Sequence, residues 1–467
     1  MLIQAIQIKN YRSIEDVTFD IKALEDGSYT FGLIGVNEAG KSSILKAMAL
    51  KDSVVKLTPK DFKDKSKNVE VLFKYKLEND DNLDEYNKII AGDTTPTVLS
   101  SVAIQSDDVV GFKLSFSATS PTVGVYEFIY SRKKSDLSMS AVVTKAFFEK
   151  THRTVFWMAK DEYLISDAIN LTTFAANPET SIPLKNSFIL AGIKDIPSAI
   201  ASFAGDTTEK KHLESKLSRA VTNHISKVWT GHPIKIQFDI DGQIITFQVM
   251  DTDAEESKAK TVDQRSDGFK QFISFLLTVS AEDSNNELRN CLLLLDEPET
   301  HLHPQAQIYF LDELKKITTN DRENVVLFAT HSNYMIDKDK LIRNFKVTKE
   351  AENTSVKLID TKDSTYASVN YEVFGIVTSD YHNELYGKLH QKFQDAKVAN
   401  EKKGILEFDT EFLHGTNKLP KDKPWRGNVN QATLSTYIRN CIHHPDNGKY
   451  SQKELKNSIE IMKKLMV

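Results

Sequence analysis

The sequence predicts an α/β fold, with a mixed sheet and antiparallel strands at its N-terminal end. Three observations support this prediction. A glycine-rich loop, residues 35–42, lies between a short apolar run and a segment with helical apolar spacing. The run 291–295 is wholly apolar and ends in two acidic residues, which is typical of a strand buried on both faces. Before the loop, segments 2–8 and 14–21 alternate apolar and polar residues, as half-buried strands do.

The composition is that of a soluble protein with more than one structural unit. The chain has 467 residues, of which 27% are charged and 40% hydrophobic, and its net charge is −5. The negative balance argues against a generally basic nucleic-acid binder, so any such contact needs a local patch. Two cysteines, Cys291 and Cys441, predict no disulfide framework and fit a reducing cytoplasm. No apolar run approaches the length of about 18 residues that a membrane span needs, so we expect a cytoplasmic protein without membrane contact.

The glycine-rich loop reads Gly-Val-Asn-Glu-Ala-Gly-Lys-Ser and predicts a P-loop. Gly35 and Gly40 let the backbone curl so that its N–H groups point at phosphate oxygens, and the following helix adds its positive end. Lys41 is predicted to reach the β- and γ-phosphates, and the Ser42 hydroxyl to bind Mg²⁺. The alternative is an ordinary glycine-rich turn. The remaining residues predicted to contact the nucleotide are Asn37, Glu38, Ala39 and Ser43.

The apolar run 291–295 ends in Asp296 and Glu297, which are expected at the carboxyl end of a buried strand, where α/β sheets bind ligands. Asp296 is suited to coordinate Mg²⁺, either directly or through a water molecule. Glu297 is placed to polarise the attacking water as a general base. The alternative is a core strand that ends at a solvated acidic turn.

A second buried run, 327–330, ends in His331 and Ser332. We predict that His331 hydrogen-bonds the γ-phosphate, although a lone histidine is more often structural. Upstream, Ser266 and Gly268 form a Ser-x-Gly turn at the start of a predicted helix. Such a turn is an anion site, or by itself only a helix cap.

In this order, the P-loop, Ser266–Gly268, Asp296–Glu297 and His331 resemble the ABC-type ATPases of the RecF, SMC and overcoming-lysogenization-defect (OLD) group, the AAA_15 and AAA_21 families. The resemblance covers most of residues 1–345. It implies heads that sandwich two ATP molecules between copies of the chain and open on hydrolysis. Ser266 and Gly268 would then act on the partner's nucleotide, and Arg12, between the first two strands, would lie near the base and ribose.

The resemblance organises the chain into four parts. Residues 1–134 form the first part of the ATPase head, 135–230 a largely helical insertion, 231–360 the second part of the head, and 361–467 a helical region for docking a partner. His152, Arg153 and Trp157, in the insertion, are interpreted as packing and surface residues. The lysine-rich segment 56–67 is a solvated loop or a phosphate-backbone contact.

The C-terminal region lacks the glutamate and spaced aspartates that a Toprim nuclease domain needs. It resembles the ATPase subunits without Toprim in two-gene anti-phage systems such as Septu and PARIS, which implies ATPase oligomers that hold a separate nuclease. Arg439 and His444 also match the Arg-x4-His pattern of HEPN ribonucleases. The alternative is structural: histidines at a helix C-terminus, which Pro445 ends.

The sequence therefore predicts an ATPase with ATP and Mg²⁺ as ligands, acting as a homodimer or higher homo-oligomer that controls a nuclease subunit in anti-phage defence. Contact with nucleic acid is left open. Two rival predictions are a DNA-repair ATPase of the RecF/SMC kind and a ribonuclease toxin fused to an ATPase.

Overall fold

A computed structural model of the chain places two compact units, Met1–Ile359 and Asp360–Val467. The structure describes residues 1–53, 55–77, 83–91, 105–106, 108–132, 135–138, 141–158, 161–166, 168–202, 206–228, 234–251, 260–261, 270, 273–277, 289–300, 302–319, 323–359, 364–397, 404–425 and 428–466.

The N-terminal strands lie in an antiparallel sheet of their own. Within the described residues this sheet has six strands in the order β2-β1-β4-β5-β6-β7. Its strands are β1 Leu2–Tyr11, β2 Ile14–Asp20, β4 Val69–Lys76, β5 Val109–Ser117, β6 Ser120–Arg132 and β7 Ser135–Ser138. Along β2 the apolar residues Ile14, Val17 and Phe19 are buried and the polar residues are exposed, which confirms the half-buried pattern. The antiparallel start is thus confirmed, but these strands form a separate sheet from the P-loop strand.

The P-loop strand belongs to a second sheet, whose order in the described part of the chain is β16-β15-β3-β14-β13-β8. Its strands are β3 Thr30–Ile34, β8 Arg153–Met158, β13 Cys291–Asp296, β14 Val325–Thr330, β15 Asn344–Glu350 and β16 Asn353–Leu358. All pairings are parallel except that of β15 with the edge strand β16. The one antiparallel pairing makes the sheet mixed. The carboxyl ends of β3, β14 and β13 meet at one edge of the sheet, which is where sheets of this kind bind ligands.

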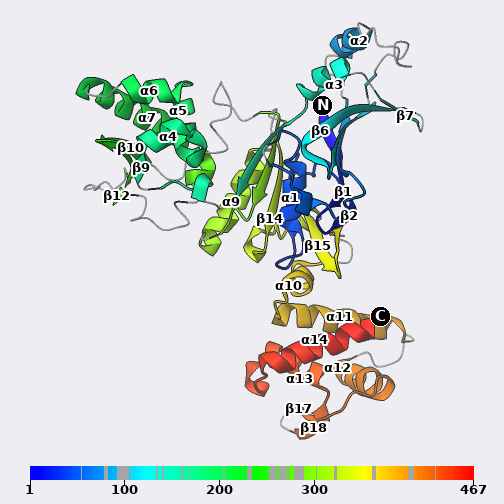
Figure 1. Cartoon of the computed structure of the whole chain (residues 1–467). Helices are drawn as coiled ribbons and strands as arrows, with labels where there is room; N and C mark the ends of the chain where they lie inside the picture. The colour runs from blue at the N-terminus through cyan, green and yellow to red at the C-terminus, as the bar shows by residue number, and fades with distance from the viewer. Residues whose placement is uncertain are drawn as a thin grey trace. The chain divides into compact units, whose positions relative to one another are not determined.

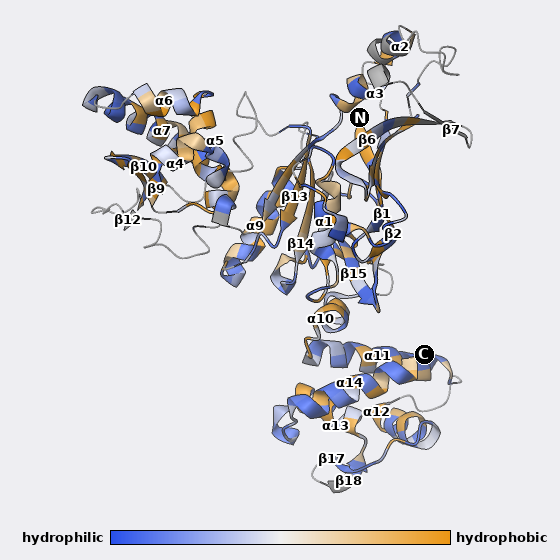
Figure 2. Ribbon diagram, in the orientation of Figure 1, coloured by the Kyte–Doolittle hydropathy of each residue, from blue (hydrophilic) through white to orange (hydrophobic). Residues whose placement is uncertain are grey.

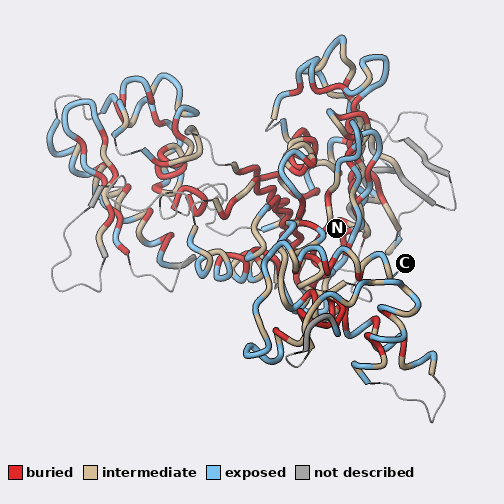
Figure 3. Tube along the Cα trace, turned by 90° about the horizontal axis from the view of Figure 1, so that it is seen from below, coloured by how far each residue is buried: buried red, intermediate tan, exposed pale blue. Residues whose placement is uncertain are grey.

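Both faces of this sheet are covered, which explains why β13 and β14 are continuously apolar. Leu292 and Leu294 pack into the core shared with the antiparallel sheet, whereas Cys291, Leu293 and Leu295 pack into a second core. In Figure 2 these strands are largely hydrophobic. Figure 3, in which the trace is coloured by burial, shows continuous buried stretches of the chain.

Two helices cover the two faces of the second sheet. Helix α1, Lys41–Met48, lies between β14 and β1, and its Ile44, Leu45 and Met48 are buried in the first core (Figure 1). Helix α9, Pro304–Lys316, packs Phe310, Leu311 and Leu314 into the second core. Because α1 starts directly at the end of the P-loop, its packing holds the loop against the carboxyl edge of the sheet.

The segment 135–230 is helical in part, but the prediction missed a core strand within it. Strand β8 pairs in parallel with β13 and carries the fully buried Trp157. Thr154, Val155, Phe156 and Trp157 are β-branched or aromatic residues in succession, which favours a strand buried on both faces. The described helices of this segment are α3 Ala141–Phe148, α4 Leu171–Ala176, α5 Ile182–Leu190, α6 Ile196–Ser202 and α7 Thr207–Val228.

Residues 234–251 form an antiparallel hairpin of β10, Ile234–Asp241, and β11, Ile244–Asp251. In the described sheet β10 is an edge strand, and the short strands β9, Ala168–Asn170, and β12, Lys260–Thr261, pair with β11. Helix α7 protects the edge: Glu214, Ser218 and Thr222, at a spacing of four residues, accept hydrogen bonds from the backbone N–H groups of Ile240, Phe238 and Ile236. These contacts block pairing with a foreign strand.

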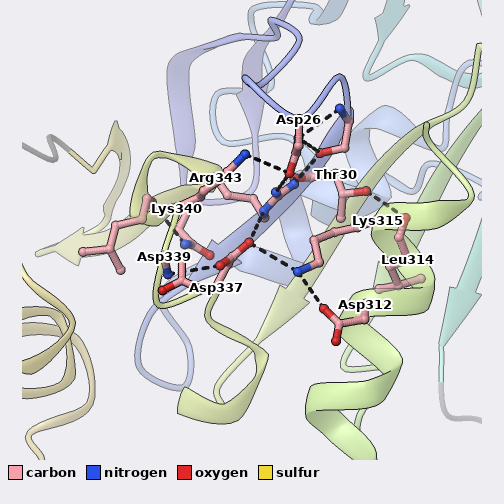
Figure 4. Close-up of polar contacts among 12 residues, drawn as sticks. Asp26, Thr30, Asp312, Leu314, Lys315, Asp337, Asp339, Lys340 and Arg343 are labelled. Carbon is pink, nitrogen blue, oxygen red and sulfur yellow. Dashed lines mark hydrogen bonds and ion pairs between the residues drawn. The ribbon is translucent and has the colours of Figure 1, made fainter. Parts of the chain in front are cut away.

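A buried ion cluster ties the amino end of β3 to the segment after β14 (Figure 4). The guanidinium of Arg343, with an exposed fraction of 0%, donates to Asp26 at 2.7 Å, to Asp337 at 3.1 Å and to the Thr30 carbonyl at 3.1 Å. Lys315 of α9 lies 3.5 Å from Asp337. The cluster therefore fixes β3 and α9 at the edge of the sheet opposite the P-loop.

The unit Asp360–Val467 is mainly helical, as predicted. Its described elements are α10 Tyr366–Phe374, α11 Ser379–Asp395, α12 Ile405–Glu407, the π-helix η7 Phe408–Thr416, β17 Lys423–Trp425, β18 Asn428–Ala432, α13 Leu434–His443, η8 Pro445–Asn447 and α14 Gln452–Met466. Hydrophobic and hydrophilic residues mix along α11 and α14, and their buried residues share one core. Among the described residues of the whole chain, none of the helices is both long and apolar enough to cross a membrane.

Candidate nucleotide-binding site

The P-loop leaves β3 after Ile34 and enters α1 at Lys41. Gly40 has a φ of +106°, and a Cβ atom there would lie 2.4 Å from the Thr354 hydroxyl oxygen. A Cβ at Gly35 would lie 2.4 Å from the Val347 carbonyl oxygen. Both positions therefore require glycine. Gly40 needs it for its positive φ, as the sequence predicted, and Gly35 needs it for its close packing on β15.

The side chain of Lys41 folds back into the curl of the loop. Its ammonium donates to the carbonyl oxygens of Gly35, at 2.8 Å, and Val36, at 2.9 Å. Burial lowers the pKa of Lys41, and the carboxylates of Glu297, Asp296 and Glu299 oppose that shift. The loop thus concentrates a buried positive charge beside three acidic groups, which fits a site for a metal-bound polyphosphate.

The structure joins Ser42 to Asp296. The Ser42 hydroxyl donates a hydrogen bond of 2.7 Å to the Asp296 carboxylate at the end of β13. Burial raises the pKa of Asp296, while this hydrogen bond and the nearby lysines lower it. A hydroxyl and a carboxylate are hard oxygen donors of the kind that Mg²⁺ prefers, so the pair fits the predicted metal site.

Glu297 and His331 also come together. Nδ1 of His331 lies 3.2 Å from the Glu297 carboxylate, and both side chains are well exposed, at 46% and 38%. Glu297 has a φ of +51°, an uncommon conformation for a residue with a side chain. Its backbone N–H donates to the Ala329 carbonyl at 3.0 Å, which anchors the turn to β14. Strain of this kind is typical of functional sites.

The structure links the turn that carries Arg12 to the P-loop through Thr354, a residue that the sequence analysis did not identify. The Thr354 hydroxyl donates to the Ala39 carbonyl at 3.1 Å and lies 2.8 Å from the Ser13 hydroxyl. Arg12 itself is held by Asp61, 2.7 Å from its Nε. No sequence signal marks Thr354, because its role arises only when β16 passes beside the loop.

Glu299 is a second residue that the sequence analysis missed. It is almost fully buried, and it accepts a hydrogen bond from Thr330, the last residue of β14. Burial raises the pKa of Glu299 to about 7. A signal was present in the sequence, since a third acidic residue follows Asp296 and Glu297 within the same turn.

Of the other predicted contacts, Asn37 and Glu38 are exposed on the loop, Ala39 is buried, and Ser43 is half-buried in α1. Ser266 and Gly268 lie outside the described residues, so their predicted action on a partner's nucleotide stays a prediction.

In the C-terminal unit, Arg439 and His444 line one cavity of about 630 Å³. The cavity is also lined by Trp425, Asn440 and Asn447, and Arg439 donates to the Asn440 side chain at 3.1 Å. Helix α13 ends at His443, two residues before Pro445. The two predicted residues therefore share a cavity and also stand at a helix end.

The match to known families supports the assignment of the nucleotide site. The family model AAA_15, described as an AAA ATPase domain, matches residues 1–189 and 189–336. The chain belongs to this AAA ATPase family. The match includes β3, the P-loop, β13 and β14, and therefore every described residue of the predicted nucleotide site.

The chain is similar to two curated proteins. It is 22% identical to the Old nuclease of Escherichia phage P2 over 374 residues, which are 75% of this chain and 60% of that protein. It is 28% identical to the uncharacterised protein MJECL43 of Methanocaldococcus jannaschii over 141 residues, 28% of this chain and 35% of that protein. The chain thus spans only about a third of the length of MJECL43 and 60% of the length of the Old nuclease. The family match and the Old nuclease confirm the predicted resemblance to the RecF, SMC and OLD group.

Solved SMC heads show more distant similarity. A SmcHead bound to the C-winged helix domain of ScpA is 13% identical, with a TM-score of 0.45, and the match covers 78% of this chain and 98% of that one. The SMC head domain from Thermotoga maritima is 10% identical, with a TM-score of 0.39, and the match covers 77% of this chain and all of the other.

Proposed function

We propose that this chain is a cytoplasmic ATPase subunit of a bacterial anti-phage complex, in which ATP-dependent closure of a homo-oligomer controls a nuclease. The observation that carries the ATPase proposal is the hydrogen bond between Ser42 and Asp296. It joins the P-loop to the acidic end of β13, beside the contact between Glu297 and His331. Because the chain belongs to an AAA ATPase family, we infer that these four side chains act together with Lys41 in binding and hydrolysing ATP.

Each residue has a definite task in this proposal. Lys41 contacts the β- and γ-phosphates. When the nucleotide binds, these phosphates replace the loop carbonyls to which the Lys41 ammonium now donates. Ser42 and Asp296 hold Mg²⁺, which when bound supplies charge neutralisation at the phosphates. Glu297 orients the attacking water and accepts its proton. His331, oriented by its Nδ1 contact with Glu297, directs its other ring nitrogen to the γ-phosphate.

A second copy of the chain completes the site in this proposal, with Ser266 and Gly268 of one copy closing over the nucleotide of the other. Arg12 serves the base or ribose. The test is nucleotide binding at millimolar Mg²⁺, followed by the oligomer mass with and without ATP. A protein that binds ATP without any change in mass would contradict closure between copies.

Control of a nuclease is supported by the similarity to the Old nuclease over 75% of this chain, and by the separate helical unit Asp360–Val467. We propose that this unit docks a separate nuclease subunit. Affinity purification from the native host, with mass measurement of whatever accompanies the chain, tests this. ATPase activity that DNA stimulates, without a nuclease partner, would instead favour the DNA-repair role.

The cavity that Arg439 and His444 share favours a second candidate function, a ribonuclease centre in the C-terminal unit. In this alternative the guanidinium and imidazole activate a ribose hydroxyl and protonate the leaving oxygen. Purified protein that cleaves RNA, and loses the activity in both Arg439→Ala and His444→Ala, would establish it. Intact RNA after incubation with the folded protein and Mg-ATP would exclude it.

A further inference from the structure

Glu299 is a buried carboxyl group that packing alone does not explain. Its exposed fraction is 2%. One carboxyl oxygen accepts the hydrogen bond from Thr330, and the other is buried without a hydrogen-bond partner in the described part of the structure. A half-satisfied buried carboxyl destabilises a fold, and an apolar side chain of similar size would avoid that cost.

Thr330 connects Glu299 to the loop that carries His331. It is fully buried at the end of β14, and while its hydroxyl donates to Glu299, the same oxygen accepts the backbone N–H of Ser332 at 2.9 Å. Thr330, before His331, is therefore bound to the Glu299 carboxyl, and Ser332, after His331, is bound to the same Thr330 hydroxyl. The Ser332 hydroxyl also donates to Gln307 of α9, which provides a second attachment.

The same carboxyl stands on the turn that carries Glu297. The distance between Glu297 and His331, 3.2 Å from Oε1 to Nδ1, is thus set by two loops that the bond from Thr330 to Glu299 holds together. Both members of the pair are exposed side chains, so their mutual contact needs support from the buried groups beneath them. A misplacement of about 1 Å at such a pair lowers turnover strongly.

We propose that Glu299 is a positioning residue for ATP hydrolysis, which through Thr330 holds His331 against Glu297. This inference rests on the proposed ATPase function. It predicts that loss of the hydrogen bond slows turnover and leaves nucleotide affinity nearly unchanged, because Lys41, Ser42 and Asp296 do not depend on it.

The test compares two substitutions at Thr330. Thr330→Val removes the hydroxyl at nearly constant shape, and Thr330→Ser keeps it. Thr318→Val is the matched control, since Thr318 is also a buried threonine that donates to a carbonyl, at the far end of α9. We expect Thr330→Val to lower kcat about tenfold or more with KM changed less than about threefold, as for a lost hydrogen bond to a charged group. Thr330→Ser should retain the wild-type kcat.

A second readout needs no turnover. The imidazole signals of His331, assigned in a ¹³C-histidine-labelled, nucleotide-free protein with His331→Gln, should shift in Thr330→Val and Glu299→Leu. They should stay near the wild-type position in Thr330→Ser and in Glu299→Gln, whose amide oxygen still accepts the hydrogen bond.

The two readouts separate the inference from the proposed function. Wild-type protein without ATPase activity would refute the proposed function, whereas the His331 signals would still decide whether Glu299 positions that loop. Unchanged His331 signals in Thr330→Val, or an equal loss of kcat in Thr318→Val, would overturn the inference.

Discussion

The hydroxyl of Ser42 donates to the carboxylate of Asp296 over 2.7 Å, although 254 residues separate them in the chain. Ser42 lies in α1, which follows β3 after the P-loop, and β3 and β13 are not neighbours in the sheet, because β14 lies between them. The contact therefore depends on α1, which starts at the carboxyl end of β3 and lies over the sheet.

Asp296→Asn removes the charge that holds Mg²⁺ and weakens the contact with Ser42. We expect kcat for ATP hydrolysis to fall at least about 100-fold, since the metal stabilises the charge that develops on the phosphates. A coupled phosphate-release assay measures this loss. Asp239→Asn, on the exposed side of β10, removes the same charge and should keep the wild-type rate. Equal rates in the two variants would show that Asp296 does not serve the metal.

Glu297→Gln keeps the shape of the side chain and removes the base. Hydrolysis should fall by about 10²–10⁴-fold while ATP still binds, so that closed oligomers accumulate. Light scattering after size-exclusion chromatography in Mg-ATP measures the mass, and phosphate release measures turnover. Glu313→Gln, on α9, is the control. Wild-type turnover in Glu297→Gln would remove this residue from the mechanism.

Thr354→Val disconnects the P-loop from the turn that carries Arg12, because its hydroxyl contacts both Ala39 and Ser13. We expect ATP affinity to fall about tenfold, the effect of one lost hydrogen bond of about 1.5 kcal/mol. Isothermal titration measures the affinity. Thr354→Ser should bind as the wild type does, and so should Thr348→Val, which removes an exposed hydroxyl that contacts Ser355. A Thr354→Val variant with normal affinity would separate this bridge from nucleotide binding.

The lowered pKa of Asp26 predicts how the stability of the fold depends on pH. Burial alone would raise the pKa of Asp26, but hydrogen bonds from Ser28 and the Arg343 guanidinium hold it well below its usual range. A carboxyl with a depressed folded-state pKa stabilises the fold above its unfolded pKa, about 4, and loses that contribution as pH falls below it.

Asp26→Asn should therefore lower the urea midpoint at pH 7, and its difference from the wild type should shrink below about pH 4. Urea unfolding followed by circular dichroism at several pH values measures the difference. Asp20→Asn, at the exposed end of β2, is the control, and its urea midpoint at pH 7 should equal that of the wild type. A constant difference for Asp26→Asn from pH 7 to pH 3 would contradict the ionic origin of the effect.

The local sequence determined the parts of this protein that need only their neighbours. The glycines of the P-loop predicted its turn because their φ and close packing exclude side chains, and the apolar run 291–295 predicted a doubly buried strand. The positions of Asp296 and His331 at strand ends followed from the rule that parallel strands present their carboxyl ends together. For the C-terminal unit the sequence predicted only a helical region as a whole, which the structure divides into α10, α11, α13, α14 and shorter elements.

The tertiary structure alone decided the contacts between segments that are distant in the chain. β8 was read as part of a helical insertion, because a short run of buried residues has no periodicity that separates strand from helix. Thr354 and Glu299 gained their roles only when β16 and β14 were placed beside the P-loop and the acidic turn. The sequence carries the propensity of each segment, whereas these hydrogen bonds depend on packing that brings their partners to within about 3 Å.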